Sequence, residues 1–206
     1  MDDSLTASIA QIVPDTEAEG PGRRFAIWFQ GCPLRCLSCC NPEFLSFQGG
    51  TPREVNDLIH EITHTNGIEG VSLLGGEPFA HARAAAALAK AAHSAGLSVM
   101  VYSGYTLAEI LALPTLDAAE LLSHTDLLVD GPYVRERAET NRRWIGSTNQ
   151  TLHFLSDRYS PDDPCWTKKN TLELRVRGAE VSINGFPAID AKELWKGWKR
   201  KPVTHG

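Results

Sequence analysis

Apolar residues fall in short runs that alternate with longer amphipathic stretches through the first 130 residues. Runs of strand length cover residues 5–13, 24–30, 69–74, 97–102 and 126–130, the first of them only weakly. Stretches with helical spacing cover residues 51–62, 81–95, 106–113 and 117–122. This alternation predicts an α/β fold in which parallel strands are joined by helical crossovers.

Two of these helices carry recognisable ends. The run Thr51-Pro52-Arg53-Glu54 has the order of a capping box with proline in the first turn, so we expect a helix to begin there. The alanine-rich helix 81–95 is expected to stop at Gly96, because glycine readily adopts the left-handed conformation that ends helices.

The pattern changes after residue 130. Residues 131–149 are polar and charged, and residues 151–155 form one further apolar run. Residues 172–176 and 181–183 predict a β-hairpin joined across 177–180. We therefore expect a single domain over residues 1–190, then a short helix and basic tail over 191–206.

Composition and charge narrow the class of protein. The chain has 206 residues, 42% hydrophobic and 22% charged, which is ordinary for one globular domain with a real core. A formal net charge of -5 gives no overall basic footprint, so we expect no nucleic-acid partner. The acidic start lacks the layout of a signal peptide, and no apolar run reaches the length of a membrane span.

Three of the five cysteines, Cys32, Cys36 and Cys39, form a C-x3-C-x2-C pattern. A disulfide would leave one sulfur over and would strain such short loops. Zinc sites usually add a second cysteine pair or histidines, which the sequence does not offer in a pattern. Three clustered thiolates suit an iron–sulfur cluster with one iron free of protein ligands. Cysteines used in this way fit a reducing cytoplasm.

Polar and glycine residues follow the other predicted strands. Gly75-Gly76-Glu77-Pro78 comes after strand 69–74, Ser103 follows strand 97–102, and Asp130 ends strand 126–130. Parallel α/β folds bind ligands at the carboxyl ends of their strands, so we expect these residues beside the cysteine loop. Taken singly, Ser103 and Asp130 are also ordinary cap or turn residues.

The cysteine spacing resembles that of the radical S-adenosyl-L-methionine (SAM) superfamily. Within it the chain looks most like the small glycyl-radical activating enzymes, such as the activases of anaerobic ribonucleotide reductase and of pyruvate formate-lyase. The likeness covers residues 20–155. It rests also on Gly20-Pro21-Gly22-Arg23-Arg24-Phe25, Phe29-Gln30-Gly31, Asn41-Pro42, Gly75-Gly76-Glu77-Pro78, Tyr102-Ser103-Gly104-Tyr105-Thr106, Asp130-Gly131-Pro132-Tyr133 and Gly146-Ser147-Thr148-Asn149-Gln150.

The resemblance implies a partial (open) TIM-like barrel, which suits a chain shorter than the about 250 residues of a complete barrel. It implies a 4Fe-4S cluster on Cys32, Cys36 and Cys39, which would be catalytic, and SAM on the remaining iron. It also implies a glycyl-radical enzyme as partner and a one-electron donor of flavodoxin or ferredoxin type. The residues expected around the cofactors are Asn41, Gly75, Gly76, Glu77, Pro78, Ser103 and Asp130.

The chain departs from this pattern beside the third cysteine. Related enzymes often carry an aromatic residue there, whereas this chain has Ser38 before Cys39 and Cys40 after it. Cys40 has three interpretations: a small packed thiol, a competing ligand, or a ligand for a second species.

Several other groups have more than one interpretation. The arginines of the 131–149 segment either grip an acidic partner or lie on a solvated loop. His60 and His64 share a helix face but no third ligand, so we expect surface residues. Cys165 has no identifiable catalytic partner. Two alternative functions stay open: a stand-alone radical SAM enzyme acting on a peptide or small molecule, and a non-catalytic zinc or iron–sulfur binding module.

Overall fold

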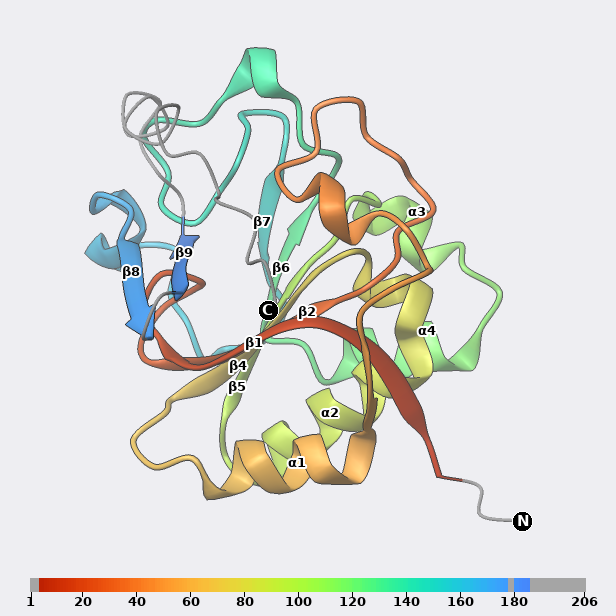
Figure 1. The fold of residues 1–206 in the computed structure, drawn as a ribbon. Coiled ribbons are helices and arrows are strands. Elements are labelled where there is room, and N and C mark those ends of the chain that lie inside the picture. The colour runs from red at the N-terminus through yellow and green to blue at the C-terminus, as the bar shows by residue number, and fades with distance from the viewer. Residues whose placement is uncertain (1–3, 178–179, 186–206) are drawn as a thin grey trace, which may run out of the picture.

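Seven strands form one mixed sheet in the computed structural model, which describes residues 4–177 and 180–185 (Figure 1). The sheet order is β3-β1-β2-β4-β5-β6-β7, and β8 and β9 form a separate hairpin. The strands are β1 Thr6–Thr16, β2 Arg24–Phe29, β3 Thr51–Glu54, β4 Gly70–Gly75, β5 Ser98–Tyr102, β6 Leu127–Asp130, β7 Thr151–Phe154, β8 Leu172–Arg177 and β9 Glu180–Gly185. The α-helices are α1 Val55–His64, α2 Ala82–Ser94, α3 Leu107–Leu111 and α4 Leu116–Ser123.

The four central strands, β2, β4, β5 and β6, run parallel, as the alternating pattern predicts. The flanking strands β1, β3 and β7 pair antiparallel. Strand β1 reverses into β2 through residues 17–23, a connection too short for a parallel crossover. Among the described residues the edge strands β3 and β7 do not pair with each other, so the sheet is open. The TIM-like partial barrel stays a prediction.

Helices α1, α2 and α4 pack against one face of the sheet. Phe25, Ile27 and Phe29 of β2 point to this face and are at most 1% exposed. They meet apolar residues of the helices, including Leu58 of α1 and Leu88 of α2. The alternate residues of β2 are buried as well, because a central parallel strand is covered on both faces.

Residues from after β6 cover the other face of the sheet. Met100, Leu127 and Val129 pack there with Trp144 and Trp166. The ring of Trp166 meets that of Trp144 edge-on, with centroids 5.6 Å apart. The chain beyond β7 therefore supplies part of the core.

A buried guanidinium ties the amino ends of the central strands together. Arg24 is 0% exposed, and in the described part of the chain no carboxylate is among its hydrogen-bond acceptors. Its nitrogens instead donate to hydroxyl and carbonyl groups on β4, β5 and the adjoining loops. The acceptors are the Ser72 and Ser98 hydroxyls, the Tyr159 hydroxyl, and the carbonyls of Pro21, Val71 and Ser98.

The expected helix start at Thr51 is wrong. Residues Thr51–Glu54 form β3, which pairs antiparallel with β1 so that Ser8 lies opposite Pro52. Helix α1 begins at Val55, with Glu54 as an N-cap that makes no side-chain hydrogen bond. Pairing with β1 satisfies the backbone of this segment, and an edge strand tolerates proline because one side of it needs no donor.

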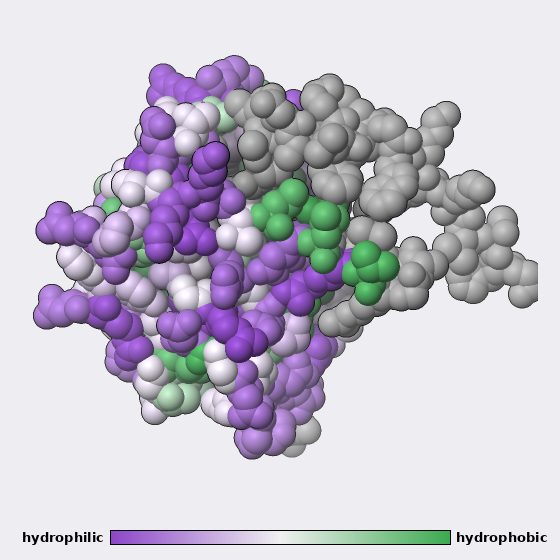
Figure 2. All heavy atoms as spheres, turned by 90° about the vertical axis from the view of Figure 1, so that its left-hand side faces the viewer, coloured by the Kyte–Doolittle hydropathy of each residue, from purple (hydrophilic) through white to green (hydrophobic). Residues whose placement is uncertain are grey.

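The predicted hairpin and the end of the alanine-rich helix are both confirmed. Gly96 follows α2 with a φ of +79°, as expected of a terminating glycine. In the hairpin, Leu174 lies directly opposite Ile183. Both are exposed together with Val176, and the face that carries the hairpin is otherwise mainly polar (Figure 2).

The predicted domain end at residue 190 and the tail 191–206 lie outside the described residues. Within the described part of the chain, no helix combines the length and the apolar character needed to cross a membrane.

Candidate functional site

The cysteines lie on a loop that leaves the carboxyl end of β2 and folds back on itself. The amide of Gly31 donates to the Phe44 carbonyl (2.8 Å), and the amide of Cys32 donates to the Leu45 carbonyl (3.1 Å). The side-chain amide of Gln30 reaches the Ser46 carbonyl at 2.6 Å. These bonds close the loop at its base and leave residues 33–41 to form its tip.

The four thiols of the loop have graded exposure. Cys32 is buried, Cys36 and Cys39 are half-buried, and Cys40 is exposed. Burial raises the pKa of the Cys32 thiol above its usual value, and the nearby backbone amides of Leu34 and Arg35 offset only part of the rise.

The third cysteine has the same kind of surroundings. The amide of Asn41 lies 3.4 Å from the Cys39 sulfur and donates to it. Burial raises the pKa of the Cys39 thiol, with the Asn41 amide acting in the opposite direction. Asn41 therefore contacts a predicted ligand through its backbone, a contact that residue type alone does not specify.

The three sulfurs do not converge on one point in this structure. Among the described residues, no group of three Cys, His, Asp or Glu side chains is placed to hold a metal ion. The chemistry of the donors still fits an iron–sulfur cluster: three cysteines lie on one short loop, and the sulfur of Cys39 accepts a backbone N–H bond. Hydrogen bonds to sulfur are among the features by which proteins tune such clusters.

The loop after β4 lies directly against the base of the cysteine loop. The amide of Glu77 donates to the Gly31 carbonyl at 3.0 Å. A Cβ atom on Gly76 would lie only 2.2 Å from the same carbonyl oxygen, so a side chain there would collide with the backbone. Gly75 passes equally close to β2, because a Cβ atom there would lie 2.6 Å from the Trp28 Cα.

Glu77 joins the loops after β4 and β5. It is 1% exposed, and its carboxylate accepts from the Phe79 amide and the Ser103 hydroxyl, each at 3.0 Å. Its other oxygen accepts from the Gly104 amide at 2.8 Å. Burial raises the Glu77 pKa to about 7, and these hydrogen bonds limit the rise. Pro78 opens the 3-10 turn Pro78–His81 that follows.

Three of the predicted loops therefore meet at one place. Leu34, at the tip of the cysteine loop, packs against Gly104, where a Cβ atom would lie 2.6 Å from the leucine Cδ1. The residues brought together are Cys32, Gly75, Gly76, Glu77 and Ser103. Leu34 was not singled out by sequence, because a lone leucine between cysteines gives no distinguishing signal.

Asp130 binds backbone amides of α3 and β7 rather than the loops that meet at Glu77. Its carboxylate accepts from the Leu107 amide of α3 at 2.6 Å and from the Thr151 amide of β7 at 3.2 Å. By strand alternation it shares a face with Leu128, which packs in the helix-covered core. The structure therefore gives Asp130 a role at the junction of β6, α3 and β7, and its predicted contact with SAM stays a prediction.

The arginines of the 131–149 segment divide into two pairs. Arg142 bonds to Glu139 and to backbone carbonyls of residues 147, 148 and 150, and Arg143 lies 4.0 Å from the centre of the Trp144 ring. Arg142 and Arg143 therefore help to fix the conformation of residues 131–149. Arg135 and Arg137 are exposed.

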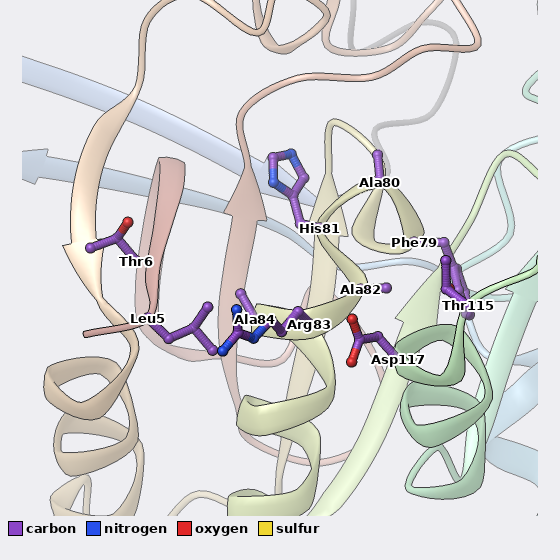
Figure 3. A pocket seen from close by; sticks show the side chains of 10 residues that line it. All are labelled: Leu5, Thr6, Phe79, Ala80, His81, Ala82, Arg83, Ala84, Thr115 and Asp117. Carbon is purple, nitrogen blue, oxygen red and sulfur yellow. The ribbon is translucent and has the colours of Figure 1, made fainter. Parts of the chain in front are cut away.

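The remaining candidates lie apart from the cysteine loop. The rings of His60 and His64 on α1 are tilted against each other, with centroids 3.8 Å apart. Burial raises the Cys165 pKa to about 11, so this thiol is not a ready nucleophile. A cavity of about 310 Å³ opens where α2 begins, with His81, Arg83 and Asp117 in its wall (Figure 3). No cysteine and no other predicted site residue lines it.

Comparison with known proteins identifies the region that carries the cysteines. Residues 18–153 match a family model described as a 4Fe-4S single cluster domain. The matched region contains the cysteine loop, the Glu77 loop and all four parallel strands.

Several individual proteins that are similar to this chain are named as activating proteins or activating enzymes. The chain is 31% identical over 153 residues to the anaerobic ribonucleoside-triphosphate reductase-activating protein of Vibrio cholerae, covering 69% of this chain and 95% of that protein. It is 29% identical over 154 residues to the protein of that name in Escherichia coli K12, covering 70% and 97%. A putative glycyl-radical enzyme activating enzyme of Haemophilus influenzae is 36% identical over 91 residues, which is 43% of this chain and 35% of that protein.

The match with the Vibrio cholerae protein spans nearly its whole length, and the family model spans well over half of this chain. The chain therefore belongs to the 4Fe-4S single cluster domain family, and it is related to the anaerobic ribonucleoside-triphosphate reductase-activating proteins.

Proposed function

We propose that this protein is a radical SAM enzyme that installs a glycyl radical on a partner enzyme of the anaerobic ribonucleotide reductase kind. The observation that carries the proposal is the loop Cys32–Cys39, held at the carboxyl end of a parallel strand in a chain related to activating proteins of that reductase. The open sheet is proposed as the partial TIM-like barrel of such enzymes.

In this proposal Cys32, Cys36 and Cys39 hold a 4Fe-4S cluster. When bound, the cluster supplies one electron that cleaves SAM to methionine and a 5′-deoxyadenosyl radical, which takes a hydrogen atom from the partner's glycine. The chain's own contribution is binding and orientation.

The loops around the cysteines are proposed to bind SAM. Gly75 ends β4 and Gly76 follows it, and without side chains these two residues let a ligand approach the backbone at the strand end. Glu77 lies at the junction of three loops, and a carboxylate there attracts the ammonium group of methionine. An ammonium close to Glu77 would keep it ionised, against the rise in pKa that burial causes. Ser103, Asp130, Asn41 and Pro78 complete the proposed contacts.

A protein substrate fits the open sheet. Among the described residues the edge strands β3 and β7 do not pair with each other, which leaves one side of the site open to a partner's loop. The exposed tip of the cysteine loop can face a partner's glycine-bearing loop. We further propose a one-electron donor of flavodoxin or ferredoxin type and a reducing cytoplasmic location, the latter because three of the five cysteines cluster in one loop, which does not suit a disulfide framework.

The test is anaerobic reconstitution with iron and sulfide, then incubation with SAM, a reductant and the cognate reductase. We expect 5′-deoxyadenosine together with a glycine-centred doublet in the electron paramagnetic resonance spectrum of the reductase. Omitting the reductase should abolish the doublet.

Two outcomes would redirect the proposal. If 5′-deoxyadenosine forms, candidate reductases stay free of radical, and a peptide or small molecule is altered instead, the protein is a stand-alone radical SAM enzyme. If the protein binds stoichiometric zinc and takes up no iron, it is a binding module without this chemistry.

A further inference from the structure

The side chain of Gln150 joins the two ends of the segment between β6 and β7. Its carbonyl oxygen accepts from the amides of Gly146 and Ser147, each at 3.0 Å. Its amide nitrogen donates to the carbonyl of Gly131, the first residue after β6, at 2.9 Å. The side-chain amide of Gln150 therefore bonds to backbone at both of its ends, and it holds Gly131 from the side of β7.

The backbone of Gln150 is itself held in place. Its amide donates to the Ser147 carbonyl at 3.0 Å, and its carbonyl accepts from the Arg142 guanidinium at 2.9 Å. Strand β7 begins at the next residue, Thr151, whose amide donates to the Asp130 carboxylate at 3.2 Å. Because its base is held in this way, the side chain of Gln150 can fix the position of the group that it bonds.

Gly131 extends this contact to the loop after β5. Its amide donates to the Tyr105 carbonyl at 2.9 Å, while its own carbonyl accepts from Gln150. The φ of Gly131 is +95°, a conformation that would strain a residue with a side chain. Gly131 therefore connects the residue before β7 to the loop after β5.

The loop after β5 connects Tyr105 to Glu77 through Ser103. The Tyr105 amide donates to the Ser103 hydroxyl oxygen at 3.1 Å, and the Ser103 hydroxyl donates to the Glu77 carboxylate at 3.0 Å. A serine hydroxyl has a single hydrogen, so the bond accepted from Tyr105 leaves that hydrogen for Glu77. The series of hydrogen bonds that begins at Gln150 therefore ends on a carboxylate that is 1% exposed.

This series of bonds passes through four separate segments of the sequence, 75–78, 102–106, 130–133 and 146–150. These four carry the part of the resemblance to activating enzymes that lies beyond residue 42. The first three contain the proposed SAM contacts Glu77, Ser103 and Asp130, whereas the last contains none. Gln150 gives the last segment a contact with the others.

We propose that Gln150 is a positioning residue, which holds Gly131 and, through Tyr105, keeps the Ser103 hydroxyl directed at Glu77. The proposal rests on the proposed function, in which Ser103 and Glu77 bind SAM. In the described part of the chain none of the hydrogen bonds of Gln150 goes to a cysteine. Gln150 therefore acts on the binding of SAM and leaves the cluster unchanged.

The test compares Gln150→Glu with the wild type. Glutamate keeps an oxygen that can accept from the amides of residues 146 and 147, but it has no hydrogen to donate to the Gly131 carbonyl. In the metal-free protein we expect the amides of Gly104, Tyr105 and Gly131 to exchange with deuterium about two- to tenfold faster, which corresponds to losing one neutral hydrogen bond. Amides of α1 should exchange at the wild-type rate.

Kinetics of the reconstituted protein separate positioning from a general loss of stability. The KM for SAM in the formation of 5′-deoxyadenosine should rise about two- to tenfold in Gln150→Glu, while kcat and iron content stay within about twofold of the wild type. Gln150→Met, which is of similar length and adds no charge, should change the same quantities in the same direction. Asn56→Asp, which adds the charge at an exposed position of α1, should behave like the wild type.

A double variant decides whether Gln150 acts through Ser103. If it does, Ser103→Ala combined with Gln150→Glu has the same KM for SAM as Ser103→Ala alone. Independent effects would instead multiply.

The proposal is overturned if Gln150→Glu leaves the exchange of the Gly104 and Tyr105 amides unchanged, if exchange accelerates but the KM for SAM does not rise, or if the effects in the double variant multiply. The exchange measurement needs neither metal nor SAM, so it separates this proposal from the proposed function. A wild type that takes up no iron would defeat the proposed function, and the exchange rates would then decide whether Gln150 holds the loop after β5.

Discussion

The two ends of the central parallel strands are built on opposite principles. At the amino ends, Arg24 is fully buried and donates to six acceptors, which bind the strands into a rigid block. At the carboxyl ends, the cysteine loop is tied mainly at its base, and its thiols become more exposed toward Cys40. The contrast indicates that the amino ends serve stability while the carboxyl ends are left adaptable for ligands. Four variants test this division.

The largest effect is expected at the carboxyl ends. Cys36→Ala removes one of three thiolates, so the reconstituted protein should lose most of its iron and acid-labile sulfide, and SAM cleavage should fall by more than about 100-fold. The urea midpoint of the metal-free protein should stay close to that of the wild type, since Cys36 is only half-buried. Iron, sulfide and denaturation measurements check both halves. Full iron content in the variant would contradict the ligand assignment.

Arg24→Met is expected to lower the stability of the fold and to leave iron uptake intact. The substitution leaves buried hydroxyl and carbonyl groups without their donor, and we expect unfolding to become easier by about 3–5 kcal/mol. Urea denaturation of the metal-free protein gives this value. Whatever fraction remains folded should still take up iron on reconstitution. A loss below about 1 kcal/mol would mean that the network at the amino ends is not what stabilises the sheet.

Glu77→Ala should affect both ligand binding and the structure of the loops, because Glu77 is part of the proposed SAM site and also links two loops. Loss of a charge-assisted contact of about 1.5–3 kcal/mol predicts a 10- to 150-fold weaker affinity for SAM. Anaerobic titration calorimetry on the reconstituted protein measures it. Glu43→Ala, which removes an exposed carboxylate from the cysteine loop, serves as the control and should change affinity by less than about twofold. Unchanged affinity in Glu77→Ala would leave that residue only its structural role.

The smallest predicted effect is a pH dependence far from the thiols. Glu19 is buried beneath the hairpin, where burial raises its pKa to about 8 despite hydrogen bonds from Gly185 and Asn184. The folded protein therefore holds a proton that the unfolded chain, with an ordinary carboxyl pKa, has already released. The free energy of unfolding should fall by about 1 kcal/mol from pH 7 to pH 8.

Glu19→Gln cannot titrate and should lack this part of the pH dependence. Glu77, with a pKa of about 7, titrates mostly below this window. Urea denaturation at both pH values compares the variant with the wild type. Equal slopes would show that Glu19 is already ionised in the fold.

The sequence predicts most elements of the fold because each is encoded by local periodicity. The central strands and the Gly96 helix end depend on neighbours only a few residues away. The error at Thr51 shows the limit of this reasoning. A capping-box order and an edge strand can be written with the same residues, and pairing with β1, more than 40 residues earlier, decides between them.

The sequence predicted only part of the candidate site, because it indicates which loops meet but not which individual distant residues contact each other. Cysteine spacing and loops at strand ends indicate which segments meet, and Glu77 does lie with Ser103 beside the cysteine loop. The acceptors of Arg24 span residues 21–159. No pattern within a short window encodes such pairs.

The covering of the sheet by Trp166 has a practical consequence for fragments of this protein. The family match ends at residue 153, a natural place to cut an expression clone. A polypeptide ending there would lack Tyr159 and Trp166, and water would reach Met100 and Leu127 on the face that they cover. Such a fragment would expose apolar strands and be prone to aggregate. Boundaries for expression, labelling or fusion should therefore be placed beyond the hairpin rather than at the edge of the family match.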